Sequence, residues 1–577
     1  MRELMLGNKA VARGMYEAGC KVISSYPGTP STEITEEAAK YDEIYCEWAP
    51  NEKVALEAAH GATLGGVRAA CAMKHVGLNV AADPLFTISY QGLNAGLVIC
   101  VADDPGMHSS QNEQDSRHYA FAAKVPMLEP ADSEESRLFV KEAYEISEKY
   151  NTPVFIKMCT RVAHSQSVVC PEERVEPAQV PYVKDPTKVM MTKNSRDAHV
   201  RVEQRTLDLI QYAETSGINR IEECAEGSLV NGKKIGVITS STSYQYTKEV
   251  FGDKVSVLKL GMVYPLPEKL IKDFAQGKDE IYVIEELDPI IENHCKQLGI
   301  QVHGKDTFPI CGEFSQNLIK KCMGMEEPEY TTIDAQIPGR PPVMCAGCPH
   351  RGIFYILHKK KIMVYGDIGC YTLGAVAPLN AMDLNVCMGA SCSGLHGFNK
   401  AMGEAGESNS VGVIGDSTFM HSGMTGITDI SYNMSNSTVI ILDNSITGMT
   451  GHQQNPTTGK NLRGEPAGKV DLEALCRALG FNRVRVVDPY DLAAVTEELA
   501  AKEPSIIISR RPCVMIKGTV HKPAIAINQD KCKGCKACMQ IGCPAISFKD
   551  KKAHIDPTLC IGCEVCKQMC RFDAIGM

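Results

Sequence analysis

The sequence predicts a multidomain α/β protein that is built on parallel sheets and ends in a small cysteine-rich module. At 577 residues the chain is too long for one hydrophobic core, so about three to five domains are expected. Short β-branched apolar runs that end in turn residues alternate with segments of helical periodicity, which is typical of buried parallel strands joined by helices. The C-terminal end instead carries cysteines in CxxC arrays.

Residues 1–175 are predicted to form the first α/β domain. A helix pattern covers residues 8–17, a strand follows at 21–25, and the turn YPGTPSTEI leads to a helix that Ser31 can cap. Further strands are predicted from the apolar runs at 96–102 and 153–158. The polar loop DDPGMHSSQNEQDSR lies between them, and a polar loop on a rigid scaffold often carries function. An ordinary solvated loop is the alternative.

Residues 176–230 are rich in proline and charge, which predicts a connector followed by one helix. Residues 231–325 alternate three strands with helices and form a further α/β domain. Glu285 and Glu286 close the third of these strands, and we interpret them as a solvated pair.

Residues 335–520 are predicted to form an α/β domain around the stretch 411–456. Two apolar runs in this stretch end in Gly415-Asp416 and in Asp443-Asn444. If these runs are neighbouring parallel strands, Asp416 and Asn444 lie together at the edge where open α/β sheets bind ligands. A carboxylate and an amide oxygen suit Mg²⁺ when diphosphate oxygens complete its shell. A βαβ unit with polar loops is the alternative.

The pattern Gly415-Asp416-Ser417 followed by Asn444 resembles the thiamine diphosphate signature. That resemblance implies that these four residues bind the cofactor and its Mg²⁺, and that the carbonyl of Ile446 is a further metal ligand. The Gly-rich turns GDIGCYTLG and CMGASCSGLHG could bring backbone N–H groups close to a diphosphate.

Residues 521–577 resemble a two-cluster ferredoxin of the bacterial type. In that pattern the fourth cysteine of each run serves the other cluster. One [4Fe–4S] cluster would take Cys532, Cys535, Cys538 and Cys570, and the other Cys560, Cys563, Cys566 and Cys543. The pattern departs from the ferredoxins in the four residues before Cys543 and in Arg571, which replaces a proline. Zinc ribbons are the alternative.

Composition and charge narrow the class of protein. The net charge of −9 is mildly acidic for this length and argues against nucleic acid as the main partner. No signal peptide and no membrane segment are evident. The chain has 25 cysteines, and the densest of them form CxxC arrays, so reduced thiols that hold clusters in a cytoplasm are expected rather than disulfides.

Taken together, these motifs are similar to those of the large (alpha) subunits of the indolepyruvate:ferredoxin oxidoreductases, within the 2-oxoacid:ferredoxin oxidoreductase family. The matching stretches are YPGTPSTEI, NEKVALEAAHGA, DDPGMHSSQNEQDSR, CAGCPHRG, GDIGCYTLG, GDSTFMHSG, LDNSITGMTGHQQNP and the ferredoxin tail. The resemblance implies a pyrimidine-binding domain at 1–175, a transketolase-C-like domain at 231–325, a diphosphate-binding domain at 335–520 and a ferredoxin domain at 521–577.

The resemblance also implies roles for residues of the first domain. Glu52 would be the glutamate that activates thiamine, although a first-turn acid favoured by the helix dipole is the alternative. Thr29 matches a threonine that contacts the substrate carboxylate in the pyruvate enzymes. Gly28 replaces an isoleucine of their motif, which would open space for a bulky aromatic substrate. His108 and Arg117 are candidate substrate residues.

A third [4Fe–4S] cluster is implied by the order of four further cysteines. The family has a CxxC, a cysteine in a Gly-Cys turn and a distant cysteine after the last strand. The same order appears here in Cys345, Cys348, Cys370 and Cys513. Buried free cysteines are the alternative.

The function implied is oxidative decarboxylation of aryl pyruvates, of the indolepyruvate type, to aryl acetyl-CoA with electron transfer to ferredoxin. The expected partners are a smaller beta subunit, external ferredoxin, coenzyme A and the 2-oxoacid, with an alpha2beta2 assembly, in the cytoplasm of an anaerobe. Three alternatives stay open: a subunit for pyruvate or another 2-oxoacid, a non-redox thiamine-dependent decarboxylase, and an electron-transfer subunit that has lost thiamine.

Overall fold

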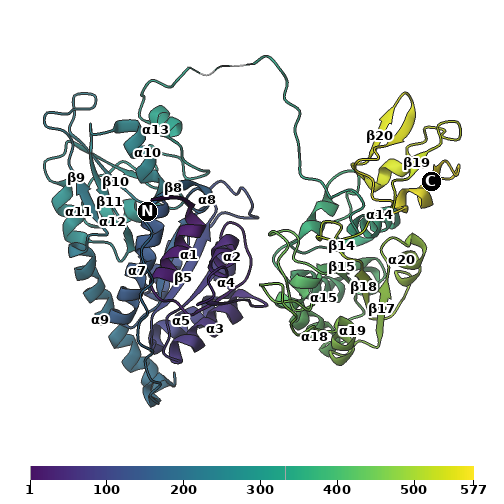
Figure 1. Ribbon diagram of the computed structural model, residues 1–577, viewed down its shortest axis with the longest axis horizontal. Coiled ribbons are helices and arrows are strands. Elements are labelled where there is room, and N and C mark those ends of the chain that lie inside the picture. Colours follow the sequence, from purple (N-terminus) through teal and green to yellow (C-terminus); the bar gives the residue numbers. More distant parts are fainter. Residues whose placement is uncertain (1, 330, 332, 577) are drawn as a thin grey trace. The chain divides into compact units, whose positions relative to one another are not determined.

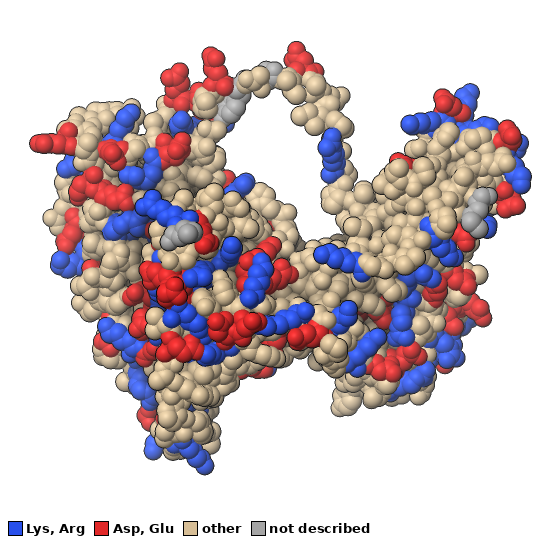
Figure 2. All heavy atoms as spheres, in the orientation of Figure 1, with Lys and Arg blue, Asp and Glu red and all other residues tan. Residues whose placement is uncertain are grey.

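The computed structural model describes residues 2–329, 331 and 333–576, and the chain divides into two units (Figure 1). Unit 1 comprises residues 1–333 and unit 2 residues 334–577. Lys, Arg, Asp and Glu side chains are interspersed over the visible faces of both units (Figure 2). In the described part of the chain, no helix combines the length and the apolar character needed to cross a membrane.

The main sheet of unit 1 has seven strands. Its central strands are fully buried and pair in parallel, as their apolar sequences require. In spatial order the strands are β12 (Met262–Tyr264), β6 (Met127–Leu128), β7 (Val154–Cys159), β5 (Leu97–Asp103), β4 (Ala69–Lys74), β2 (Val22–Ser25) and β3 (Tyr45–Trp48). A short pair, β1 (Glu3–Leu6) with β8 (Gln166–Val169), lies outside this sheet.

Helices of the first predicted domain follow the strands. They are α1 (Gly7–Glu17), α2 (Thr32–Ala38), α3 (Glu52–Leu64), α4 (His75–Val80), α5 (Ala82–Gln91), α6 (Arg117–Ala123), α7 (Ser133–Tyr150) and α8 (Thr160–His164). The side chain of Asn51 caps α3 by accepting the N–H of Val54. The predicted cap of α2 is wrong in detail, because the Ser31 hydroxyl donates to the carbonyl of Gly28 at 2.8 Å instead.

The second sheet of unit 1 has four strands. In order they are β13 (Glu280–Ile284), β10 (Ile235–Thr239), β11 (Ser256–Lys259) and β9 (Arg220–Glu222). The accompanying helices are α10 (Ser241–Phe251), α11 (Glu268–Ala275), α12 (Ile290–Gln297) and α13 (Gln316–Cys322). The helix predicted in the connector is α9 (Thr192–Thr215), which follows a 3₁₀ turn at Pro186–Lys188.

The two sheets of unit 1 are connected more closely than separate domains would be. Strand β12 follows β11 in the chain but pairs antiparallel with β6 of the seven-stranded sheet. The division of unit 1 at residues 175 and 230 therefore stays a prediction.

The interpretation of Glu285 and Glu286 as a solvated pair is wrong. Glu285 is buried, and its Oε2 atom accepts a hydrogen bond from Nη1 of Arg117 at 2.5 Å. Arg117 also binds Asp115, with Nη2 2.6 Å from its Oδ2 atom. The sequence could not show this, because Arg117 and Glu285 belong to segments that are far apart in the chain.

Unit 2 is organised by a parallel five-stranded sheet, in the order β14 (Met363–Tyr365), β15 (Ser410–Gly415), β16 (Thr438–Asp443), β18 (Ser505–Arg510) and β17 (Arg483–Val487). Apolar cores cover its two faces. The strands predicted at 411–414 and 439–442 are confirmed as β15 and β16.

The helices of this part are α14 (His350–Lys360), a 3₁₀ turn at Cys370–Ala375, α15 (Ala390–Met402), α16 (Glu404–Glu407), α17 (Asp416–Thr418), α18 (Met424–Tyr432), α19 (Leu472–Ala478) and α20 (Leu492–Glu498). A π-helical turn, Phe419–Gly423, joins α17 to α18. Such turns often occur beside functional sites.

The C-terminal end of unit 2 is a small module with two short sheets. They pair β19 (Ala526–Ile527) with β22 (Ile575–Gly576) and β20 (Ile546–Lys549) with β21 (Lys552–Ile555). Two 3₁₀ turns, Ala537–Ile541 and Val565–Met569, accompany them. The module's core contains two of the predicted cluster ligands, Cys538 and Cys566.

The buried position of Arg117 generates a stability prediction. We expect Arg117→Met to lower the free energy of unfolding by about 3–5 kcal/mol, because it leaves buried carboxylates without their cation. Chemical denaturation followed by circular dichroism measures this difference. Lys269→Met, which removes the exposed pair of Lys269 with Asp273, is the control and should leave the transition unchanged. Equal stability of both variants would contradict the buried ion pair.

Candidate active site and cluster-binding sites

The carboxyl ends of β15 and β16 place Asp416 and Asn444 at one edge of the sheet. The strands pair in parallel with Gly415 opposite Leu442, so the residues that follow leave the sheet side by side. Both side chains are buried. Ile446 donates its backbone N–H to the side-chain oxygen of Asn444 at 3.3 Å. All three predicted metal ligands therefore lie at this edge, and their oxygens are of the kind that Mg²⁺ binds.

Hydrogen bonds from three neighbours orient the Asp416 carboxylate. Its Oδ1 atom accepts the N–H of Ser417 at 2.8 Å, and its Oδ2 atom accepts the hydroxyl of Thr457 at 3.2 Å. The side chain of Asn455 also hydrogen-bonds to it. The sequence pattern does not single out Asn455 and Thr457, although the polar stretch QQNPTT contains both. They act as supports that fix the direction of the carboxylate.

Burial makes the carboxyl of Asp416 a weaker acid than an exposed aspartate. Loss of hydration raises the pKa of the Asp416 carboxyl to about 7, and the negative charge of Asp443 adds to this effect. The hydrogen bonds from Ser417 and Thr457 act in the opposite direction. A divalent cation at this carboxylate would offset the cost of its buried charge, so the donor set matches a bound Mg²⁺.

The two Gly-rich turns predicted to approach a diphosphate lie next to each other. Asp367, in the first turn, accepts the N–H of Gly389 at 2.9 Å and that of Ser391 at 3.2 Å, both in the second turn. Gly389 has a φ of +90°, and a Cβ there would lie 2.6 Å from the Cβ of Ser422. A side chain at this position is therefore excluded by both conformation and space.

Glu52 in unit 1 is buried at the first turn of α3. A Cβ added to Gly77, near the start of α4, would lie 2.4 Å from Oε1 of Glu52. The carboxylate therefore packs against the backbone of Gly77, in a space that any larger residue would fill. This buried position differs from that of a solvated first-turn acid and agrees with a carboxyl that meets a cofactor.

Thr29 lies half-buried in the turn between β2 and α2. The space beside its neighbour Gly28 is lined by Lys74, since a Cβ on Gly28 would lie 3.0 Å from that of Lys74. Lys74 is buried and donates through Nζ to the carbonyl of Ser109 at 2.6 Å. Burial lowers its pKa to about 8, against the opposing influence of Asp104. The sequence pattern gave no sign of this lysine.

The other two candidate substrate residues differ in their surroundings. His108 is partly exposed, and its Nε2 atom lies 3.2 Å from Oε2 of Glu313. Arg117 uses its guanidinium to bind Asp115, Glu285 and nearby backbone carbonyls, which leaves it a structural role. A substrate contact by Arg117 is not supported by this placement, whereas His108 stays a candidate.

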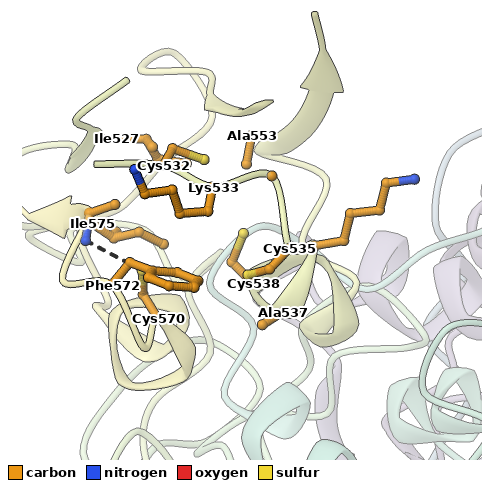
Figure 3. Close-up of a pocket in the computed structure, with 13 residues that line it drawn as sticks. Ile527, Cys532, Lys533, Cys535, Ala537, Cys538, Ala553, Cys570, Phe572 and Ile575 are labelled. Atoms are coloured by element: carbon orange, nitrogen blue, oxygen red, sulfur yellow. Dashed lines mark hydrogen bonds between the residues drawn. The ribbon is translucent and has the colours of Figure 1, made fainter. Parts of the chain in front are cut away.

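The first ferredoxin-like cysteine set lines a single pocket in the C-terminal module (Figure 3). The set comprises Cys532, Cys535, Cys538 and Cys570. Apolar residues such as Ile527 and Ala553 complete the lining. The N–H of Ala574 donates to Sγ of Cys570 at 3.3 Å, as expected near a sulfur that carries negative charge.

The second cysteine set also converges, although its members come from both runs. The thiol of Cys566 interacts electrostatically with those of Cys543, Cys560 and Cys563. It also interacts with the thiol of Cys538 in the first set. The two sets therefore lie next to each other, with the exchange of the fourth cysteine that the sequence predicts.

The third predicted set is Cys345, Cys348, Cys370 and Cys513. Cys513 interacts electrostatically with Cys345, as do Cys348 and Cys370. The edge of the sheet that carries Asp416 and Asn444 is called the metal edge below. The third set lies beside it, because the N–H of Cys513 donates to the carbonyl of Asn444 at 2.9 Å. His452 flanks it, with Nε2 3.9 Å from Sγ of Cys513.

Among the residues that the structure describes, no three or more His, Cys, Asp or Glu side chains are arranged to hold one metal ion. An iron–sulfur cluster is larger than an ion, so its thiolates surround it more widely.

Three family models match the chain. The model described as "Pyruvate flavodoxin/ferredoxin oxidoreductase, thiamine diP-bdg" matches residues 13–223. "Thiamine pyrophosphate enzyme, C-terminal TPP binding domain" matches residues 367–509, and "4Fe-4S binding domain" matches residues 553–576. These segments contain Glu52, the Asp416–Asn444 edge and the second cysteine run, respectively.

Curated relatives match over nearly the full chain. "Indolepyruvate oxidoreductase subunit IorA" of Pyrococcus horikoshii is 38% identical over 99% of this chain and 96% of its own length. The protein of the same name from Methanothermobacter marburgensis is 37% identical over 100% of this chain and 97% of its own. "2-oxoglutarate synthase subunit KorA" of Methanocaldococcus jannaschii is 26% identical over 48% of this chain and 86% of its own.

The raised pKa of Asp416 generates a prediction about binding of Mg²⁺ with thiamine diphosphate. Below about pH 7 the carboxyl is protonated, so the cation must displace a proton before it binds. We expect the affinity to fall by up to roughly tenfold for each pH unit below 7. Calorimetric titration at pH 6 and pH 8 measures this. Asp416→Asn should bind weakly at both values, and an equal affinity of the unmodified chain at both would contradict the prediction.

Proposed function

The chain belongs to the family of indolepyruvate oxidoreductase subunit IorA, and from this premise we propose that it oxidatively decarboxylates aryl pyruvates with thiamine diphosphate. The product is an aryl acetyl-CoA, and the electron pair leaves through [4Fe–4S] clusters to ferredoxin. The observation that carries the proposal is the hydrogen bond between Cys513 and Asn444, which joins a set of four thiols to the metal edge.

Residues of unit 2 hold the diphosphate end of the cofactor. Asp416, Asn444 and the carbonyl of Ile446 would bind Mg²⁺, while Gly415 and Ser417 line the same edge. The buried carboxylate of Asp416 provides the charge, and Thr457 keeps it oriented. The two Gly-rich turns, which Asp367 ties together, would lie against the diphosphate.

The family resemblance assigns residues of unit 1 to the reacting end of a thiamine diphosphate. When bound, thiamine diphosphate supplies a nucleophilic carbon and an electron sink for the decarboxylation. Glu52, whose carboxyl is buried against Gly77, would hydrogen-bond to the aminopyrimidine ring of the cofactor and so promote formation of the nucleophilic carbon. Thr29 and Lys74 would bind the 2-oxoacid carboxylate, to which Lys74 brings a buried cation, and His108 is a further candidate for a substrate contact.

Three [4Fe–4S] clusters serve as one-electron carriers. The first two are bound by the cysteines of the C-terminal module, and the third by Cys345, Cys348, Cys370 and Cys513. The third set lies next to the metal edge, so it provides the nearest acceptor for electrons from the cofactor. We further propose a smaller beta subunit as partner in an alpha2beta2 assembly, with coenzyme A as acyl acceptor and the cytoplasm as location.

The proposed activity is tested with the complex of this chain and its beta subunit under anaerobic conditions. The assay measures ferredoxin reduction with coenzyme A and a panel of indolepyruvate, phenylpyruvate, hydroxyphenylpyruvate and pyruvate. We expect aryl pyruvates to give a kcat/KM at least about tenfold above that of pyruvate, because binding discriminates large apolar substrates.

The same assay distinguishes the alternatives. Glu52→Gln should fold and bind thiamine diphosphate but lose most of its turnover. Equal or better turnover of pyruvate would contradict the proposal that aryl pyruvates are the substrates. Release of free aldehyde without ferredoxin reduction would indicate a non-redox decarboxylase, and a purified chain that retains no thiamine diphosphate would indicate a non-catalytic electron-transfer subunit.

The third cluster is tested by iron analysis of the anaerobically purified chain. Three [4Fe–4S] clusters correspond to about twelve irons per chain, and we expect Cys345→Ala to retain about eight. Cys387→Ala is the matched control, since this exposed cysteine lies in the same domain and outside the three sets. Unchanged iron content in Cys345→Ala would remove the third cluster.

A further inference from the structure

The loop Cys345–Cys348 is in direct contact with the second cysteine set of the C-terminal module. Gly347 has a φ of +65°, and a Cβ there would lie 2.3 Å from the side chain of Ile561 and 3.8 Å from the Cβ of Cys563. The hydroxyl of Tyr490 donates to the carbonyl of Gly347 and fixes the loop from another side. Two proposed cluster sites therefore lie side by side here, with the side chain of Ile561 against the loop.

Arg351 spans this contact from the first turn of α14. Its side chain is buried, and within the described part of the chain its guanidinium donates to backbone carbonyls. Nε donates to the carbonyl of Cys345 at 3.0 Å and Nη2 donates to that of Met344, both in the segment that leads into the loop. Nη1 donates to Gly542 at 2.6 Å and to Ile541 at 3.2 Å, both in the module. The planar guanidinium thus holds the two sides together.

Thiols of both cysteine sets lie near the positive charge of Arg351. The guanidinium interacts electrostatically with Cys345 and Cys348 of the third set and with Cys543 and Cys563 of the second. Among the described residues, the ion pairs resolved at this junction include Arg511 with Asp488 but not Arg351. A buried cation whose hydrogen bonds all go to neutral carbonyls is costly unless negative charge lies nearby. Clusters with thiolate ligands would provide that charge.

We propose that Arg351 is the shared counter-cation of the two neighbouring clusters and holds them at a fixed separation. The proposal rests on the proposed function, because it requires clusters at both sites. Reduction adds an electron to a cluster, and a buried positive charge nearby stabilises the reduced state. Arg351 therefore raises the reduction potential of both clusters. An arginine is suited to this role because it stays charged when buried.

The test is a redox titration followed by electron paramagnetic resonance, performed on the anaerobically purified complex. We expect Arg351→Met to shift the potentials of both adjacent clusters to more negative values. The cluster of Cys532, Cys535, Cys538 and Cys570 should shift less and serves as the internal reference. Arg351→Lys keeps the positive charge but loses the planar set of donors. We therefore expect it to retain both reduction potentials while the magnetic coupling between the two clusters becomes weaker.

Arg511→Met is the matched control. Arg511 lies over the ring of Tyr490 at 4.1 Å in the same junction, but Asp488 already neutralises its charge. Arg511 interacts electrostatically with Cys563 of the second set, so we expect this variant to shift the potential of that cluster less than Arg351→Met does and to leave that of the third cluster unchanged. Should it shift them as far as Arg351→Met does, the specific role of Arg351 would be refuted.

Two further outcomes separate this proposal from the proposed function. If Arg351→Met lowers thermal stability but leaves every potential at its original value, Arg351 is only a structural tie and the counter-cation is overturned. If the unmodified chain contains iron for two clusters only, the shared role is overturned together with the third cluster. If the unmodified chain contains iron for three clusters and Arg351→Met leaves the reduction potentials unchanged, the role of Arg351 is overturned and the proposed function is not.

Discussion

The parallel pairing of β15 with β16 is the constraint on which the chemistry of unit 2 depends. One register places Asp416 and Asn444 at the same edge of the sheet, and a slip of one residue would turn one of them toward the apolar core. The strands are buried on both faces, so this register is strongly specified. The π-helical turn and the stretch around Asn455 then fit around an edge that is already determined.

The cysteine sites depend on this sheet to different degrees. Cys513 follows β18 directly and is tied to Asn444, so the sheet that carries the metal edge also carries part of the third set. The C-terminal module, in contrast, has a small core made partly of its own cysteines. A module of this size gains little from apolar burial, and bound clusters are the natural source of its stability.

Local patterns predicted much of this arrangement, and distant pairings did not. The strands around Asp416 and Asn444 follow from apolar runs with turn residues, and the cysteine sets follow from spacing. The burial of Glu285 depends on Arg117, which lies far away in the chain, so the expectation of a solvated pair failed. Lys74 and Thr457 were missed for the same reason: the proposed role of each depends on neighbours that the fold supplies.

The pairing of β12 with β6 in unit 1 limits where the chain can be divided. Because β12 completes the edge beside β6, residues 1–230 alone would end their main sheet at a two-residue strand with unpaired backbone groups. Such an open edge invites pairing with other chains. A fragment that follows the sequence boundaries would therefore tend to aggregate, and an engineered split of this polypeptide belongs after residue 333, where the contacts of unit 1 end.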